Sequence, residues 1–268
     1  MPDPYASIAD TEKSVQERLS NVLELRGADL RQQEMLQSYL SSIAFPQSSK
    51  VLEVGCGTGV VSRYIASLKN VASVVGIDPS PVFIEKATTL SKNIAGLSFA
   101  TGDARSLNFA DETFDLVVFH TSLCHVPLPE KALKEAYRVL RRGGILAVFD
   151  GDYVSVTVAL DDQDPLQLAV NTMVDNFVEN KWLIRQLPKV LTNLGLSLKA
   201  FRSHGYSAVS DPSYMFTLID RGVEIMVESG MIGGNQGEAL QSEARRRAQA
   251  GEFFGHITYI SVIAEKAP

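Results

Sequence analysis

Three glycines stand within five positions, Gly55, Gly57 and Gly59, between an apolar run and a stretch with helical periodicity. A glycine-rich turn that joins a strand to a helix lets backbone N–H groups approach a bound ligand closely. A dinucleotide-binding turn has the spacing G-x-G-x-x-G, and its third glycine would fall at Val60. A phosphate-binding loop needs a lysine after its last glycine, and this turn has none. The spacing therefore argues against both kinds of site.

Carboxylates accompany this turn and the ends of the next two predicted strands. Glu53 precedes the turn, where it would repel a diphosphate and favour a ligand with a cationic amino-acid ammonium. Asp78, about 20 residues after the turn, can accept hydrogen bonds from both hydroxyls of a ribose. Asp103 can accept from an exocyclic adenine amine, and Ala104 can offer its backbone N–H to a ring nitrogen. These residues together predict S-adenosylmethionine as the ligand.

The elements that must position these residues alternate between strands and helices. Short apolar strands are predicted at 50–54, 71–78, 97–103, 114–120 and 144–150, with helices between them at 58–70, 80–93 and 129–144. Such alternation is typical of a parallel sheet with helices on both faces, which binds ligands beyond the carboxyl ends of its strands. The polar and glycine residues do cluster at those ends, at 55–59, 78, 102–104, 120–125 and 150–153.

The flanking segments have different patterns. Residues 1–10 read as a loose arm, and apolar residues three and four apart then predict two amphipathic helices between 15 and 43. After the strand at 144–150, helices are expected at about 165–180 and 181–194, then a strand near 196–209 and a largely helical segment at 211–250. The last strand, 256–266, alternates as an antiparallel strand near a sheet edge would.

Four segments resemble, in order, the motifs of class I S-adenosylmethionine-dependent methyltransferases: VLEVGCGTG, VVGIDPSP, TGDARSLNFADETFDLVV and LRRGGILAVFD. The resemblance is continuous over about residues 30–150. Within that superfamily the chain is most similar to the broad group of ubiquinone and menaquinone C-methyltransferases and small-molecule methyltransferases, without a quinone-substrate signature. The resemblance implies an α/β fold with a doubly wound, seven-stranded, mostly parallel sheet whose last strand is antiparallel. We expect an N-terminal helical arm (1–45) over the cofactor, a Rossmann-like core (46–210 and 251–268), and a helical cap or substrate lid (211–250).

The resemblance also implies a role for each matching residue. Glu53, Gly55 and Gly57 would line the methionine side of the cofactor, and the backbone near His120 and Thr121 would close it. Asp78 would hold the ribose, and Asp103 and Ala104 the adenine. Cys56 and Pro79 fall within the same motifs and are counted as cofactor contacts, although Cys56 could simply pack. An arginine from the N-terminal helices, Arg31 or Arg26, would bind the methionine carboxylate.

Three histidines are candidate general bases: His120, His125 and His256. A neutral imidazole can take a proton from a hydroxyl or thiol nucleophile, and the alternative is a histidine hydrogen-bonded to nearby backbone. Asp150 or Asp152 could orient a substrate hydroxyl or amine, or simply belong to a surface turn. The predicted function is methyl transfer by in-line displacement to an O, C or N atom of a small, largely apolar metabolite. The alternative is a protein that binds S-adenosylmethionine without transferring methyl.

Composition excludes several other classes of function. The 25 basic and 31 acidic residues give a formal charge of −6, which argues against a nucleic-acid partner. No apolar run reaches the roughly 18–20 residues of a membrane span, and the first residues lack the pattern of a secretory signal. The two cysteines suffice for neither a disulfide framework nor a structural zinc site, and no metal is expected. We therefore expect a cytoplasmic protein, with its oligomeric state left open.

Overall fold

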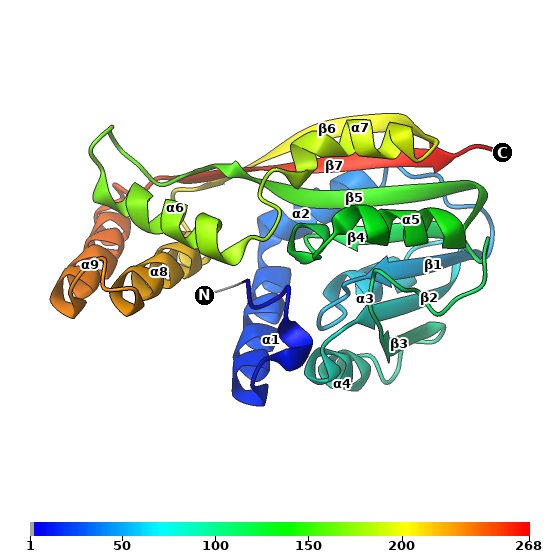
Figure 1. Cartoon of the computed structure of the whole chain (residues 1–268), viewed down its shortest axis with the longest axis horizontal. Coiled ribbons are helices and arrows are strands. Elements are labelled where there is room, and N and C mark those ends of the chain that lie inside the picture. The colour runs from blue at the N-terminus through cyan, green and yellow to red at the C-terminus, as the bar shows by residue number, and fades with distance from the viewer. Residues whose placement is uncertain (1–2) are drawn as a thin grey trace.

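The computed structural model describes residues 3–268, which contain a seven-stranded sheet of order β3-β2-β1-β4-β5-β7-β6. The first five strands pair in parallel, and β7 runs antiparallel to both β5 and β6 (Figure 1). The predicted fold class is confirmed. The strands are β1 (Ser49–Val54), β2 (Val71–Asp78), β3 (Leu97–Thr101), β4 (Phe114–His120), β5 (Leu140–Thr157), β6 (Leu196–Ala208) and β7 (Gly255–Lys266).

Helices cover both faces of the sheet, as the apolar character of its central strands requires. On one face, α2 (Leu30–Leu40) and α3 (Val60–Ala66) pack against β1, β4 and β5. On the other face, α5 (Pro129–Val139) and α7 (Leu183–Asn193) pack against the same strands. The central strand β4 is buried over almost its whole length. Its successive side chains point alternately into the two hydrophobic cores on either side of the sheet.

Local signals set the helix starts near the carboxyl end of the sheet. α4 (Pro81–Leu90) begins as predicted, because the Ser80 hydroxyl accepts a hydrogen bond from the Phe83 backbone N–H at 3.1 Å and Pro81 occupies the first turn. α2 is capped by the Asp29 side chain, which accepts from two backbone N–H groups of its first turn. α3 begins later than predicted, because Gly59 adopts a left-handed conformation before it.

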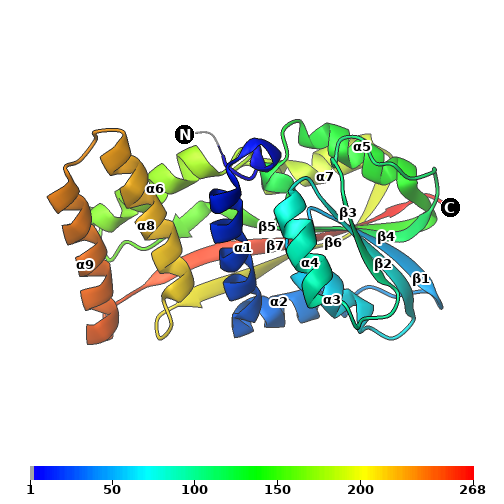
Figure 2. The same ribbon diagram turned by 90° about the horizontal axis from the view of Figure 1, so that it is seen from below.

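The strand predicted at 144–150 is much longer in the structure. β5 continues to Thr157, because residues 145–152 pair with residues 258–265 of β7. Gly151 and Asp152, which resemble a turn in sequence, lie opposite Tyr259 and Thr258 instead. The extended ends of β5, β6 and β7 lead to three helices grouped beside the core: α6 (Pro165–Phe177), α8 (Ser213–Glu228) and α9 (Gly234–Ala250) (Figures 1 and 2).

The N-terminal segment is more ordered than the sequence predicts. Residues 3–10 form turns and a short 3-10 helix (Ile8–Asp10), and the side chains of Asp3 and Ile8 are almost fully buried. The expectation of a loose arm is therefore wrong for residues 3–10, while residues 1 and 2 lie outside the described part of the chain. α1 (Lys13–Ala28) follows and lies between the α6–α8–α9 group and α4 in both views (Figures 1 and 2).

Candidate functional site

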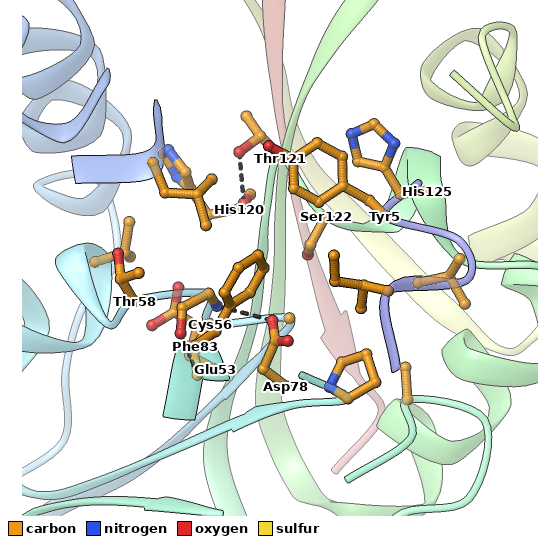
Figure 3. A pocket seen from close by; sticks show the side chains of 18 of the residues that line it. Tyr5, Glu53, Cys56, Thr58, Asp78, Phe83, His120, Thr121, Ser122 and His125 are labelled. Atoms are coloured by element: carbon orange, nitrogen blue, oxygen red, sulfur yellow. Dashed lines mark hydrogen bonds between the residues drawn. The ribbon is translucent and has the colours of Figure 1, made fainter. Parts of the chain in front are cut away.

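A cavity of about 660 Å³ opens at the carboxyl ends of β1, β2, β3 and β4. The glycine turn, Asp78, residues 101–105, residues 120–122 and residues 125–127 all line it, together with residues 5–10 and parts of α1 and α2. Figure 3 shows side chains from these separate segments around one hollow. The strand ends that the sequence singles out therefore share one site, with the exception of 150–153.

The glycine turn requires glycine both for its backbone conformation and for its close contacts. Gly55 and Gly57 have φ values of +73° and +52°, in the left-handed region that other residues rarely adopt. A Cβ atom on Gly55 would lie 2.5 Å from the Ser122 Cβ, and one on Gly57 would lie 2.8 Å from Leu23. The turn thus passes directly beside the end of β4 and beneath α1. Cys56 is buried between these glycines and also lines the cavity.

Asp78 lies at the end of β2, and its side chain points toward the hollow in Figure 3. Its two carboxylate oxygens accept hydrogen bonds from the backbone N–H groups of Gly57 and Ser80, each at 2.9 Å. Each oxygen keeps a further lone pair for a ligand. Burial raises the pKa of Asp78 to about 6, against the opposing effect of the two backbone donors. The carboxylate therefore fixes the turn and remains available to the cavity.

Glu53 is a second buried acid in the cavity lining, on β1. The Ser62 hydroxyl of α3 donates a hydrogen bond to its carboxyl group. Burial raises the pKa of Glu53 to about 8, although the bond to Ser62 acts in the opposite direction. Burial therefore favours the protonated form of Glu53. A cation nearby would favour its ionised form.

At the far side of the cavity, Pro79, Asp103 and Ala104 lie together in the lining. The Asp103 carboxylate is paired with the Arg105 guanidinium at 2.7 Å, and this partner holds the pKa of Asp103 below its usual range. Asp103 is thus ionised and partly exposed at the cavity edge. The sequence does not indicate this pairing.

Two residues at the end of β4 are held by distant partners. Thr121 has a φ of +51°, which is strained for a β-branched residue, and its hydroxyl accepts a hydrogen bond from the Arg26 guanidinium of α1. His120 is hydrogen-bonded through Nδ1 to the Tyr39 hydroxyl of α2 at 3.0 Å. Its ring stacks on Phe149, with centroids 4.7 Å apart. Burial, together with the Arg26 charge, holds the pKa of His120 well below its usual range.

Of the two candidate arginines, Arg26 lines the cavity and Arg31 does not. The Arg31 guanidinium lies over the Tyr206 ring, 5.8 Å from its centroid. Within residues 3–268, the Arg26 guanidinium forms no ion pair, and the Thr121 hydroxyl is its only hydrogen-bond partner. The geometry therefore favours Arg26 of the two candidates, and a role for either arginine in binding a carboxylate stays a prediction.

The remaining candidate catalytic residues lie apart from one another. His125 lines the cavity, but its Nδ1 lies 2.7 Å from the carboxylate of Asp3. His256 lies outside the lining, beside the hydroxyls of Ser207 and Thr258. His256 thus belongs to β7 and does not line the cavity, so its position does not support a role as a general base.

The acids after the predicted strand 144–150 also lie outside the cavity lining. Asp150 is buried and accepts hydrogen bonds from the backbone N–H groups of Cys124 and Gly151. Asp152 pairs with Arg185 at 2.8 Å. Because β5 continues past both residues, they have structural partners instead of facing a ligand.

Several residues that line the cavity are not predicted from the sequence. Residues 5–10 are the largest group, because nothing local indicates that they fold back over the cavity. Gln32 and Thr58 are buried lining residues, and the side-chain oxygen of each has no hydrogen-bond partner within residues 3–268. Such orphaned polar atoms are unusual in a protein interior. The burial of Gln32 could have been predicted, because this residue lies on the apolar face of α2, one turn before Met35 and Leu36.

The predicted cap does not contribute to the cavity wall. None of residues 211–250 lines the cavity, and Met215, Ile219 and Met226 of α8 pack in the core cluster instead. A lid function for this segment stays a prediction.

Residues 52–148 match the family described as "Methyltransferase domain". They form a class I methyltransferase domain. The resemblance read from the sequence is confirmed for this domain, and S-adenosylmethionine is the cofactor of its class. The matched residues include the glycine turn, Asp78, Asp103 and the end of β4.

The individual relatives match different shares of the chain. It is 27% identical over 226 residues to an uncharacterized 37.1 kDa protein of a Streptomyces fradiae transposon, covering 81% of this chain and 62% of that protein. It is 34% identical over 133 residues to a sterol 24-C-methyltransferase of Aspergillus fumigatus, covering 48% of this chain and 34% of that enzyme. The chain thus spans about a third to three fifths of the length of these relatives. The fold resembles the crystal structure of a proposed Bacillus halodurans methyltransferase, with a TM-score of 0.63 and 21% identity over 87% of this chain and 99% of that one.

Two features are absent from residues 3–268, the part of the chain that the structure describes. No helix there has both the length and the apolar composition needed to cross a bilayer. No group of three or more histidine, cysteine, aspartate or glutamate side chains is arranged there to hold a metal ion.

Proposed function

We propose that the protein transfers a methyl group from S-adenosylmethionine to an O, C or N atom of a small, largely apolar metabolite. The observation that carries this proposal is that one cavity contains the glycine turn, the Asp78 carboxylate and an arginine that has no acidic partner within residues 3–268. Its volume of about 660 Å³ falls within the range of small-molecule sites, about 300–1,000 Å³.

The lining supports one orientation of the cofactor. Asp78 would accept hydrogen bonds from the ribose hydroxyls, and Ala104 with Asp103 would contact the adenine at the β3 side of the cavity. The methionine end would then lie against Gly55 and Gly57. Its ammonium group suits Glu53, whose ionised form a cation stabilises. Its carboxylate suits Arg26, because a guanidinium binds a carboxylate in a two-pronged geometry.

Methyl transfer from S-adenosylmethionine requires the protein mainly to align the methyl group with its acceptor. When bound, S-adenosylmethionine supplies an already activated methyl group on its sulfonium. Residues of this chain would hold the acceptor in line with that group and exclude water. Orientation of this kind can remove about 7–11 kcal/mol of the barrier. Apolar side chains in the lining, among them Ile8, Leu23, Leu36 and Phe83, support an acceptor of largely apolar character.

Calorimetry with S-adenosylhomocysteine tests the cofactor half of the proposal. We expect binding to the wild-type protein and a loss of at least tenfold in affinity for Asp78→Ala, because the ribose contact and the fixed turn are both removed. Asp111→Ala is the control, since its side chain is 74% exposed and does not line the cavity. Absence of binding, or full affinity in Asp78→Ala, would contradict the proposal.

A second measurement separates transfer from binding alone. Incubation of the protein with S-adenosylmethionine and fractionated metabolite extracts should form S-adenosylhomocysteine in at least one fraction. A protein that binds the cofactor normally but forms no product in any fraction would support the alternative, a cofactor-binding protein without transfer. Mass spectrometry of an active fraction then identifies the acceptor by its added methyl group.

A further inference from the structure

His120 is the histidine whose surroundings define its chemistry most fully. It lies at the end of β4 between the cofactor side of the cavity and strand β5, and it lines the cavity. Phe149 stacks on one face of its ring at 4.7 Å, with planes 11° apart, and Tyr39 lies nearly parallel at 5.8 Å. This packing fixes the plane of the imidazole. The ring nitrogens therefore have defined directions.

The hydrogen bond to Tyr39 determines which nitrogen carries the proton. The Tyr39 hydroxyl is buried, and within residues 3–268 its only hydrogen-bond partner is His120 Nδ1, at 3.0 Å. If Nδ1 carried the proton, the Tyr39 hydroxyl hydrogen would be left without an acceptor in the protein interior, which costs about 1–3 kcal/mol. If Tyr39 donates, both groups are satisfied. Nδ1 is thus the acceptor, and the proton of the neutral ring lies on Nε2.

Nε2 has no hydrogen-bond partner within residues 3–268, so it is the nitrogen that a ligand can meet. The Arg26 guanidinium, which binds the adjacent Thr121, places a positive charge on the same side of the cavity and opposes a second proton on the imidazole. A neutral ring with its proton on Nε2 presents a donor, not a lone pair. In this state it is no general base, contrary to the sequence-based hypothesis for His120.

We propose that His120 donates a hydrogen bond from Nε2 to an oxygen atom of the bound ligand, and that Tyr39 is the positioning residue that keeps it in this tautomer. The inference rests on the proposed function, because it concerns the same cavity. The ligand oxygen has two candidate sources, the carboxylate of the cofactor and an oxygen of the methyl acceptor. In the second case the acceptor molecule carries a phenolate, carboxylate or carbonyl oxygen beside the methylated atom.

Nuclear magnetic resonance of the full chain labelled with ¹⁵N-histidine tests the tautomer without any ligand. At neutral pH the His120 signal, assigned by its loss in His120→Gln, should show the proton on Nε2. Tyr39→Phe should release the ring into a mixture of both tautomers. A proton on Nδ1, or a doubly protonated ring, in the wild-type protein overturns the proposal. This readout is independent of whether S-adenosylmethionine binds.

Two substitutions then locate the ligand oxygen. Glutamine can place a side-chain N–H near the position of Nε2 and cannot act as a base, whereas leucine has no donor. If the oxygen belongs to the cofactor, His120→Leu should weaken S-adenosylhomocysteine binding about 10- to 100-fold, and His120→Gln should restore most of that loss. If it belongs to the acceptor, the same pattern should appear only in the rate of S-adenosylhomocysteine formation from S-adenosylmethionine in metabolite extracts.

The outcomes also separate this inference from the proposed function. If His120→Gln restores neither S-adenosylhomocysteine binding nor S-adenosylhomocysteine formation, His120 acts as a base, and the donor role is overturned. Binding and product formation that are both unchanged in His120→Leu overturn it as well. By contrast, a wild-type protein that fails to bind S-adenosylhomocysteine while its His120 signal shows the Nε2 proton contradicts the proposed function alone.

Discussion

At the scale of single residues, the site is defined by three ionisable side chains in one cavity lining, two buried acids and an arginine. Glu53 and Asp78 are acids held in a low-dielectric cavity, and Arg26 is a guanidinium in the same lining without an acidic partner within residues 3–268. Isolated charges of this kind are costly to bury. A ligand with both an ammonium and a carboxylate would offer Glu53 and Arg26 partners of opposite charge.

Glu53 should make the ligand-free protein less stable as the pH rises. Its pKa is raised in the folded state from 4.5 to about 8, so its contribution to stability is fully present below pH 4.5 and is lost as the pH rises through 8. We expect the melting temperature of the wild-type protein to fall more between pH 5 and pH 9 than that of Glu53→Gln. Scanning calorimetry at several pH values measures this difference. Equal slopes for the two proteins would show that Glu53 ionises normally.

Arg26→Gln should reduce the affinity for S-adenosylhomocysteine by about 10- to 100-fold, because a charged hydrogen bond to the carboxylate is removed. Arg31→Gln is the matched control, since Arg31 lies on the neighbouring helix and outside the lining. It should change the affinity less than threefold. Calorimetry compares the two variants, and the reverse ranking would restore Arg31 as the carboxylate ligand.

At the scale of elements, the pair α6 and α8 is joined by one very close contact. A Cβ atom on Gly222 of α8 would lie 1.8 Å from the backbone oxygen of Ala169 in α6. Gly222→Ala should therefore force the helices apart and lower the free energy of unfolding by about 1–3 kcal/mol or more. Gly234→Ala is the control: within residues 3–268, its added Cβ would meet no atom within 4 Å apart from its chain neighbours and the nearby backbone of its own helix, so it should be nearly neutral or slightly stabilising. Chemical denaturation measures both.

Gly222→Ala also tests whether the predicted cap, residues 211–250, affects cofactor binding. Because no residue of 211–250 lines the cavity, the folded fraction of Gly222→Ala should bind S-adenosylhomocysteine with wild-type affinity. A large loss of affinity in folded protein would indicate that the position of α8 controls the cavity.

The order and type of most elements follow from local patterns. Alternating strands and helices predict β1 to β4 and α4 at nearly their observed positions, and Ser80 with Pro81 predicts the start of α4. The start of α5 is also predicted, but the helix ends at Val139 instead of 144 because β5 begins at Leu140. The length of β5 does not follow, because residues 151–157 extend only where β7 pairs with them from about a hundred residues away. Pairing between distant strands has no local signature in the sequence.

At the scale of the whole molecule, residues 3–10 form a strap across the cavity that connects three regions of the chain. Asp3 is buried, and its carboxylate accepts hydrogen bonds from the backbone N–H groups of Tyr5 and Glu179 and lies 2.7 Å from His125 Nδ1. Tyr5 packs against the His125 ring, with centroids 4.8 Å apart. One carboxylate thus fastens the strap to the loops after β4 and after α6.

Asp3→Ala should release this strap. Removing an acceptor that serves several partly buried donors leaves them without this partner, and an unsatisfied donor costs up to about 1–3 kcal/mol where it is buried. We expect faster hydrogen exchange in residues 5–10 and dissociation of S-adenosylhomocysteine accelerated about tenfold or more. Glu12→Ala, an exposed acid just after the strap with no side-chain capping bond, should change neither quantity. Stopped-flow kinetics measure the dissociation, and an unchanged rate in Asp3→Ala would mean that the strap does not retain the ligand.

The sequence by itself determined the class of sheet, the glycine turn and the carboxylates at the strand ends, because each depends on residues only a few positions apart. The tertiary structure decided which arginine faces the cavity, which nitrogen of His120 is free and what covers the site. Those features depend on partners far apart in the chain: Tyr39 and His120 are 81 residues apart, Arg26 and Thr121 are 95 apart, and Asp3 and His125 are 122 apart. Only the folding of the sheet and its N-terminal helices brings such pairs within hydrogen-bonding distance.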